Sequence, residues 1–169
     1  SVVKRLLSDE CKVLCPVRNP TGVKRNILSG DIGQIEVFDF DLHDLSDLEN
    51  FIKKSDVVLN LIGLLFEKSN MSFELAHFLL PKKISFYAEK YNKPFLHVSS
   101  LGSSYHTKSN YLISKKMGEE FIENNNTNYI IIRPSIVYGE DDNFINQFGK
   151  MAKLLPFLPL YQKGETKFQ

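Results

Sequence analysis

A tyrosine and a lysine four residues apart, Tyr111 and Lys115, are the two residues of this 169-residue chain best suited to chemistry together. Residues four apart on a helix share a face, so the lysine ammonium can approach the phenol. A free tyrosine titrates near 10, and a cation at about 4 Å in an effective dielectric of about 20 stabilises a phenolate by roughly 4 kcal/mol. The pair is therefore suited to general acid/base work. The simpler interpretation is two side chains on the wall of a helix.

The position of the pair decides more than its spacing, because chance alone predicts nearly one such pair in a chain of this composition. The pair follows a strand-like segment that ends in Ser99 and Ser100. Ligands of parallel α/β sheets bind at the carboxyl ends of the strands. Either serine hydroxyl is therefore placed to orient a substrate oxygen beside the pair. The alternative for both serines is a turn with local backbone hydrogen bonds.

Strand-like and helical segments alternate along the chain. The apolar, β-branched segments typical of strands are 12–17, 35–40, 56–62, 94–100 and 128–137. The segments with helical periodicity are 1–10, 45–52 after the capping signature Ser46-x-x-Glu49, 73–91 and 111–123. Near-continuous apolar runs are typical of strands covered on both faces, so this order predicts an α/β fold with a doubly wound parallel sheet.

Both ends of the sequence suggest that the domain continues beyond them. No strand or glycine loop precedes the first helical segment, so we expect the sheet to lack its first strand. The apolar, proline-containing segment "LLPFLPL" (154–160) leads only into polar residues. We expect residues 1–150 to form the dinucleotide-binding domain and residues 151–169 to begin a substrate-binding or lid region.

Composition argues against several classes of protein. The formal net charge is +1 with both signs interspersed, so nucleic acid is not an expected partner. The apolar runs are too short to span a bilayer and contain Asn60 and Arg133, so the chain is not expected to be transmembrane. Cys11 and Cys15 lie roughly 13 Å apart in an extended segment, too far to bridge, and are expected to be small core residues in a reducing compartment. The four histidines lack metal-binding spacing, so no metal site is expected.

Three motifs resemble the short-chain dehydrogenase/reductase family, in its atypical and extended members: "HVSSLG" (97–102), "YLISK" (111–115) and "IIRPSIVYG" (131–139). Further segments are similar to the branch that contains the NADPH-binding accessory subunit of respiratory complex I and its bacterial epimerase/dehydratase-like homologues. These segments are "NLIGLLFE" (60–67), "YGEDDNFINQF" (138–148) and "LLPFLPL". The resemblance implies a Rossmann-like fold that binds a nicotinamide dinucleotide.

The resemblance also implies roles for individual residues. Tyr111 would be the general acid/base, and Lys115 would bind the nicotinamide ribose. Ser100 would polarise the substrate carbonyl, with Ser99 as the alternative. The other cofactor-lining positions are Asp41 and Leu42 near adenine, Asn60, Leu61, Ile62 and Gly63 after the 56–62 strand, and Pro134, Ser135 and Val137 beside the nicotinamide.

Arg18 bears on the choice of cofactor. It follows the 12–17 segment, where an acidic residue would bind the ribose hydroxyls of NAD. A guanidinium instead pairs with a 2′-phosphate, so the sequence favours NADP(H) over NAD(H). The alternative is a solvated arginine at a strand end.

The family's glycine-rich phosphate turn has no counterpart in these residues. Gly30 and Gly33 lead into a strand rather than a helix, so they form a turn and not a phosphate loop. We therefore expect only the longer native chain to bind a dinucleotide well.

The resemblance leaves the function open between two classes. One is an oxidoreductase that transfers hydride to or from a carbonyl or alcohol, including an apolar or quinone-related substrate. The other is a non-catalytic accessory or assembly subunit of complex I, with other complex I subunits as its partners. The implied location is the bacterial cytoplasm or the mitochondrial matrix side, with peripheral association at the inner membrane left open.

Overall fold

The computed structural model describes residues 2–22, 31–103 and 108–137, together with 139, 146, 149, 151 and 153. The predictions for Gly30, for most of "YGEDDNFINQF" and for "LLPFLPL" lie outside the described residues. So does nearly all of the predicted second region at 151–169.

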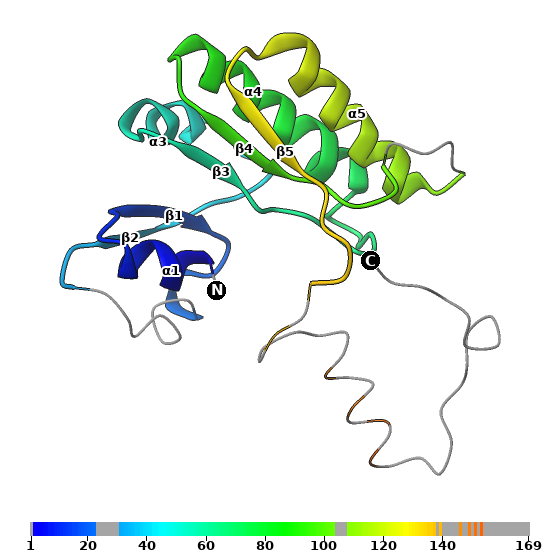
Figure 1. The fold of residues 1–169 in the computed structure, drawn as a ribbon, viewed down its shortest axis with the longest axis horizontal. Helices are drawn as coiled ribbons and strands as arrows, with labels where there is room; N and C mark the ends of the chain where they lie inside the picture. Colours follow the sequence, from blue (N-terminus) through cyan, green and yellow to red (C-terminus); the bar gives the residue numbers. More distant parts are fainter. Residues whose placement is uncertain are drawn as a thin grey trace.

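The described strands are all parallel and form two hydrogen-bonded groups (Figure 1). In the first group, β1 (Val13–Val17) pairs with β2 (Ile35–Asp39). The second group has the order β3-β4-β5, formed by β3 (Val58–Asn60), β4 (Phe95–Val98) and β5 (Tyr129–Ile132). The predicted α/β class with a parallel sheet is confirmed, and each strand is shorter than its sequence segment.

Helices connect the strands, as parallel pairing requires. The connecting helices are α3 (Leu48–Lys54), the π-helical segment η1 (Glu74–Leu79), α4 (Leu80–Lys90) and α5 (Asn110–Asn125), and α1 (Val2–Ser8) precedes β1. Figure 1 shows α4 and α5 side by side over one face of β3, β4 and β5.

Two local predictions from the sequence are wrong. Ser46 does not cap α3, because the helix begins two residues later and the residue before it, Asp47, makes no side-chain capping bond. The Ser46 backbone amide instead donates to Asp44 Oδ1 in a local turn. Short polar side chains such as that of Asp44 often form local bonds of this kind, which compete with helix formation. Both cysteines are free, but Cys11 is exposed and so is not a core residue.

The main core lies between the three-stranded sheet and the helices. Its buried members include Leu48, Ile52, Leu80, Ile84, Ala88, Phe95 and Ile122. Phe40 and Leu42, which follow β2, are buried in the same cluster and so tie the two-stranded group to the larger one. On β4 and just after it, the buried positions alternate as Phe95, His97 and Ser99, so the core-facing side of this strand turns polar at its carboxyl end.

The segment η1 begins the long helix with a wider turn that has an identifiable cause. The Leu80 N–H bonds to the Leu75 carbonyl, five residues back. Pro81 has no N–H, so the carbonyl of His77 cannot receive its usual α-helical donor. That carbonyl faces α5 at Gly118, where an added Cβ would lie 2.1 Å from the oxygen. A side chain at Gly118 would therefore push the two helices apart.

We predict that Gly118→Ala destabilises the protein. Overpacking against backbone costs about 1–3 kcal/mol, and here it outweighs the gain of about 1 kcal/mol that alanine brings to a helix interior. The expected net loss is up to about 2 kcal/mol in the free energy of unfolding, measured by urea denaturation. Asn124→Ala, at an exposed position of the same helix, is the matched control and should change stability by less than about 0.5 kcal/mol. Equal urea midpoints for Gly118→Ala and wild type would contradict the close helix crossing.

Candidate functional site

Lys115 is the centre of the candidate site, because its buried ammonium meets the ends of two strands. The residue is only 5% exposed. Its Nζ donates to the Val98 carbonyl at 3.3 Å, at the end of β4. It also lies 3.3 Å from where a Cβ of Gly63 would be, just after β3. Burial lowers the pKa of Lys115, and the charge of Glu119 partly opposes this shift.

Tyr111 lies one turn before Lys115 on α5. The Lys115 ammonium is 5.9 Å from the centre of the Tyr111 ring. The ring is half-buried and packs edge-on against Phe73 at 5.6 Å and His77 at 5.3 Å between ring centroids. Two neighbouring aromatic rings therefore fix the direction of the tyrosine side chain.

Two buried histidines lie near the lysine, and the sequence motifs assign a role to neither of them. His77 and His97 are each 1% exposed. Burial, and then the positive charge of Lys115, lower the pKa of each to about 4. Both imidazoles are therefore neutral at physiological pH, and no helical or strand periodicity in the sequence marks them as site residues.

The predicted serines lie at the carboxyl end of β4 beside these groups. Ser100 Oγ is buried and makes no hydrogen bond to the described residues, and the same is true of His97 Nε2. Ser99 Oγ lies close enough to Glu119 to help lower its pKa, although its geometry falls short of a hydrogen bond. The site therefore contains polar atoms that the described chain leaves available to a ligand or to water.

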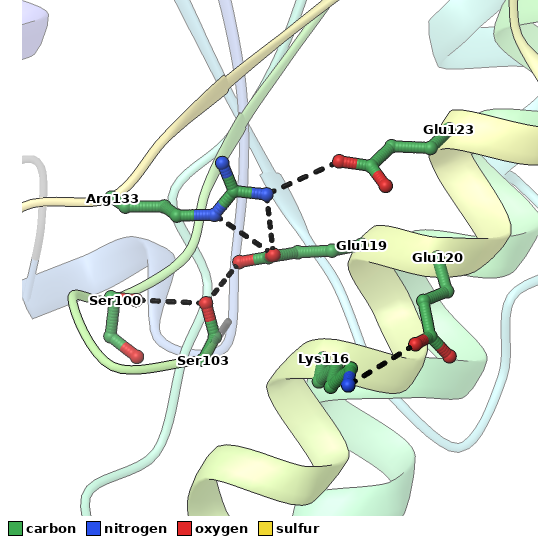
Figure 2. A network of polar contacts seen from close by, with 7 residues as sticks. All are labelled: Ser100, Ser103, Lys116, Glu119, Glu120, Glu123 and Arg133. Atoms are coloured by element: carbon green, nitrogen blue, oxygen red, sulfur yellow. Dashed lines mark hydrogen bonds and ion pairs between the residues drawn. The ribbon is translucent and has the colours of Figure 1, made fainter. Parts of the chain in front are cut away.

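A second polar cluster, around Glu119, holds the loops beside the serines (Figure 2). The Glu119 side chain is 3% exposed and accepts two hydrogen bonds from Arg133, at 2.9 and 2.8 Å. It also accepts one from Ser103 Oγ at 2.7 Å. Burial raises the pKa of Glu119, but these hydrogen bonds outweigh it and hold the pKa below its usual value. The carboxylate thus joins α5 to the ends of β4 and β5.

The other predicted site residues lie at the carboxyl ends of the strands, with different exposure. Arg18 after β1, Asp41 after β2, and Leu61 and Gly63 after β3 are exposed. Leu42 is 3% exposed in the core, which leaves only its backbone to face a ligand.

The remaining predicted positions follow their strands closely. Asn60 is buried and its Oδ1 accepts the Ile62 N–H at 3.1 Å. Pro134 accepts the Leu101 N–H at 2.8 Å, which joins the loops after β4 and β5. Ser135 is half-buried and Val137 exposed beyond β5.

The described part of the chain offers neither a metal-binding cluster nor a membrane-spanning helix. No group of three or more histidine, cysteine, aspartate or glutamate residues in that part could hold a metal ion. None of its helices is long and apolar enough to cross a bilayer.

Comparison with known proteins identifies the family. The sequence pattern described as NAD(P)H-binding matches residues 1–153. The chain belongs to the NAD(P)H-binding family. This confirms the predicted resemblance to the short-chain dehydrogenase/reductases and the Rossmann-like fold.

The chain is similar to curated relatives over part of their length. The chain is 33% identical over 171 residues to "NADH dehydrogenase [ubiquinone] 1 alpha subcomplex subunit 9, mitochondrial" of Arabidopsis thaliana, covering 99% of this chain and 42% of that protein. It is 34% identical over 138 residues to the Mus musculus protein of the same name, covering 81% of this chain and 36% of the other. It therefore spans less than half the length of these relatives.

Solved structures support the fold of this NAD(P)H-binding domain. The Bordetella bronchiseptica enzyme WbmG, solved in complex with NAD, superposes with a TM-score of 0.70 at 18% identity. The match covers 90% of this chain and 55% of that one. At this identity the likeness establishes the arrangement of the chain and not its activity.

We predict that the stability of this domain falls as the pH drops from 6.5 toward 5. His77 and His97 have pKa values of about 4 when folded, against 6.5 when exposed. Stability from the neutral histidines is therefore complete above pH 6.5 and is lost as the pH falls toward 4, by up to about 1.4 kcal/mol per pH unit for each group. Urea denaturation between pH 7 and 5 measures the slope, above the range in which carboxylates titrate.

Replacing one histidine gives the control for this prediction. His97→Leu removes one of the two titrating groups and should roughly halve the slope between pH 6.5 and 5. A free energy of unfolding that stays constant over this interval in the wild-type protein would contradict the prediction.

Proposed function

We propose that this NAD(P)H-binding domain places the nicotinamide ribose of NADP(H) against Lys115 and, in the complete protein, supports hydride transfer to or from a carbonyl or alcohol. The observation that carries the proposal is the buried Lys115 ammonium between the ends of β3 and β4. Ligands bind at such strand ends in doubly wound sheets.

The residues around this position fit a dinucleotide. Gly63 is exposed and its missing side chain leaves its backbone open to a ligand beside Lys115. The Ser100 hydroxyl lacks a partner among the described residues and can donate to a substrate oxygen. A bound nicotinamide would supply the hydride, which no side chain can provide.

In this reaction the chain itself would handle the proton. Tyr111 would exchange a proton with the substrate oxygen, since its ring is held beside Lys115 by Phe73 and His77. The Lys115 ammonium would stabilise the phenolate that results. Ser100 would hold the substrate oxygen within reach of the phenol.

Arg18 supports NADP(H) as the preferred cofactor. Its guanidinium is exposed directly after β1, and a guanidinium binds a phosphate with paired, charge-assisted hydrogen bonds. Asp41 lies after the neighbouring strand β2 and fits the adenosine end of the same ligand.

Binding of the pyrophosphate would need one more strand, with its phosphate-binding turn, than the described sheet contains. The strand groups β2-β1 and β3-β4-β5 are not hydrogen-bonded to each other. In the doubly wound order 3-2-1-4-5-6, one further strand lies at this point, and its glycine-rich turn holds the phosphates. We infer that residues outside this sequence supply that strand and turn in the complete protein.

The second candidate is a non-catalytic NADPH-binding accessory or assembly subunit of complex I, on the matrix side of the inner membrane. Sequence identity of 33% and 34% to mitochondrial NADH dehydrogenase subunits favours it. In such a subunit, the cofactor would stabilise the fold without turning over.

We predict that the complete protein binds NADPH more tightly than NADH, and that Arg18 is responsible. Arg18→Glu should weaken NADPH relative to NADH by at least about tenfold, because a hydrogen bond to a charged group is worth about 1.5–3 kcal/mol. Lys83→Glu, the same change of charge at an exposed position of α4, is the control. Cofactor fluorescence titration measures each dissociation constant.

Two results would count against this account of binding. An unchanged cofactor preference in Arg18→Glu would remove the role of Arg18. Equal NADPH affinity of residues 1–169 and of the complete protein would disprove the inferred phosphate-binding turn.

We predict that Tyr111→Phe lowers turnover about 100-fold or more, as expected for loss of a general acid, while the dissociation constant of NADPH changes less than about threefold. The measurement is NADPH oxidation by the complete protein with a panel of carbonyl compounds. A bound NADPH that does not turn over with any of them, together with co-purification of complex I subunits, would favour the accessory subunit instead.

A further inference from the structure

His77 occupies the point where η1, α5 and the loop after β3 meet. Its Nε2 lies 2.9 Å from the Leu64 amide nitrogen, and its Nδ1 lies 2.9 Å from Ser114 Oγ. Ser114 Oγ in turn donates to the Tyr111 carbonyl at 2.8 Å. One imidazole thus links the loop to the turn of α5 that carries Tyr111 and Lys115.

The direction of these hydrogen bonds determines the tautomer of His77. A backbone N–H can only donate, so Nε2 must accept from Leu64 and carry no proton. The single proton of the neutral ring is therefore on Nδ1, from which it is donated to Ser114 Oγ. Burial favours this neutral ring over the charged one.

His97 provides the opposite case in the same site. Asn60 Oδ1 accepts the Ile62 amide, so Asn60 Nδ2 is the donor to His97 Nδ1 at 3.1 Å. The His97 proton is therefore on Nε2. The two neighbouring imidazoles are thus assigned different tautomers.

These contacts fix the loop after β3 at two places. Asn60 holds the Ile62 amide and His77 holds the Leu64 amide, with the exposed Gly63 between them. A Cβ at Gly63 would lie 3.3 Å from Lys115 Nζ and 3.8 Å from His77 Nε2. The His77 ring also stacks on Phe73 at 5.3 Å between ring centroids, which fixes its plane.

We propose that His77 is a positioning residue that, as a neutral Nδ1-protonated imidazole, holds the Gly63–Leu64 backbone at a fixed distance from Lys115 and Tyr111. It is not an acid or base in the reaction, because both ring nitrogens are bonded within the protein and the residue is 1% exposed. The importance of this position for the cofactor rests on the proposed function. The tautomer and the loop contact do not.

The tautomer can be measured directly in the complete protein labelled with 15N-histidine. Long-range 1H–15N correlation spectra at pH 7 should show His77 protonated on Nδ1 and His97 protonated on Nε2, so that each serves as the reference for the other. A His77 ring protonated on Nε2, or on both nitrogens, would overturn the proposal without any mutation.

Two variants separate the two hydrogen bonds of His77. In His77→Gln, the side-chain oxygen can replace Nε2 as the acceptor for Leu64, whereas in His77→Asn the shorter amide reaches only toward Ser114. The Leu64 amide should exchange with solvent at nearly the wild-type rate in the Gln variant. In the Asn variant it should exchange at least about tenfold faster, as expected for loss of this partly buried hydrogen bond.

NADPH affinity connects the loop to the cofactor. We expect a dissociation constant within about threefold of wild type for His77→Gln and raised about tenfold for His77→Asn. An Asn variant with a protected Leu64 amide and wild-type affinity would overturn the proposal. If the wild-type protein binds neither NADPH nor NADH, the proposed function fails, whereas Leu64 exchange still decides whether His77 holds the loop.

Discussion

The close crossing of α5 over the π-helical turn at His77 is the constraint on which the rest of the site depends. The crossing requires Gly118, since a Cβ there would lie 2.1 Å from the His77 carbonyl oxygen. With this contact in place, Ser114 reaches the His77 ring and Lys115 reaches the ends of β3 and β4. A contact between backbones thus sets the positions of the polar groups of the candidate site, in keeping with the frequent occurrence of π-turns at functional sites.

Two buried polar clusters surround the end of β4, and they favour opposite charges. One contains His77, His97 and Lys115, and its burial disfavours positive charge. The other contains Glu119, whose negative charge is balanced by Arg133 and also partly favours the Lys115 ammonium. Buried charges are costly unless paired or hydrogen-bonded. This arrangement therefore keeps one ammonium inside the domain while both neighbouring histidines stay neutral.

The sequence predicts the strands, the helix of Tyr111 and Lys115, and the parallel sheet, because these depend on local composition and periodicity. It does not predict the π-turn or the His77 contact, because both depend on which backbone meets another across the fold. Pro81 within a helical pattern and Gly118 in the facing helix are the available signals, and neither alone identifies its partner. Ser46 shows the opposite error, in which a sequence motif is present but the predicted structure is not. The capping motif at Ser46 does not cap α3, because the Ser46 amide forms a local turn with Asp44.

The two halves of the proposed ligand would meet very different parts of this domain. Around Lys115, hydrogen bonds within the protein hold the buried His77 ring, Ser114 and the Lys115 side chain in place. Arg18 and Asp41, at the adenosine end, are exposed. A preorganised region loses little entropy on binding, so it favours one orientation of the ligand. Backbone amides at a helix N-terminus attract the negative charge of a phosphate. They therefore add affinity without determining how the nicotinamide is oriented. The described residues therefore account for how a nicotinamide would be oriented, and the inferred phosphate-binding turn would determine how tightly the dinucleotide is held.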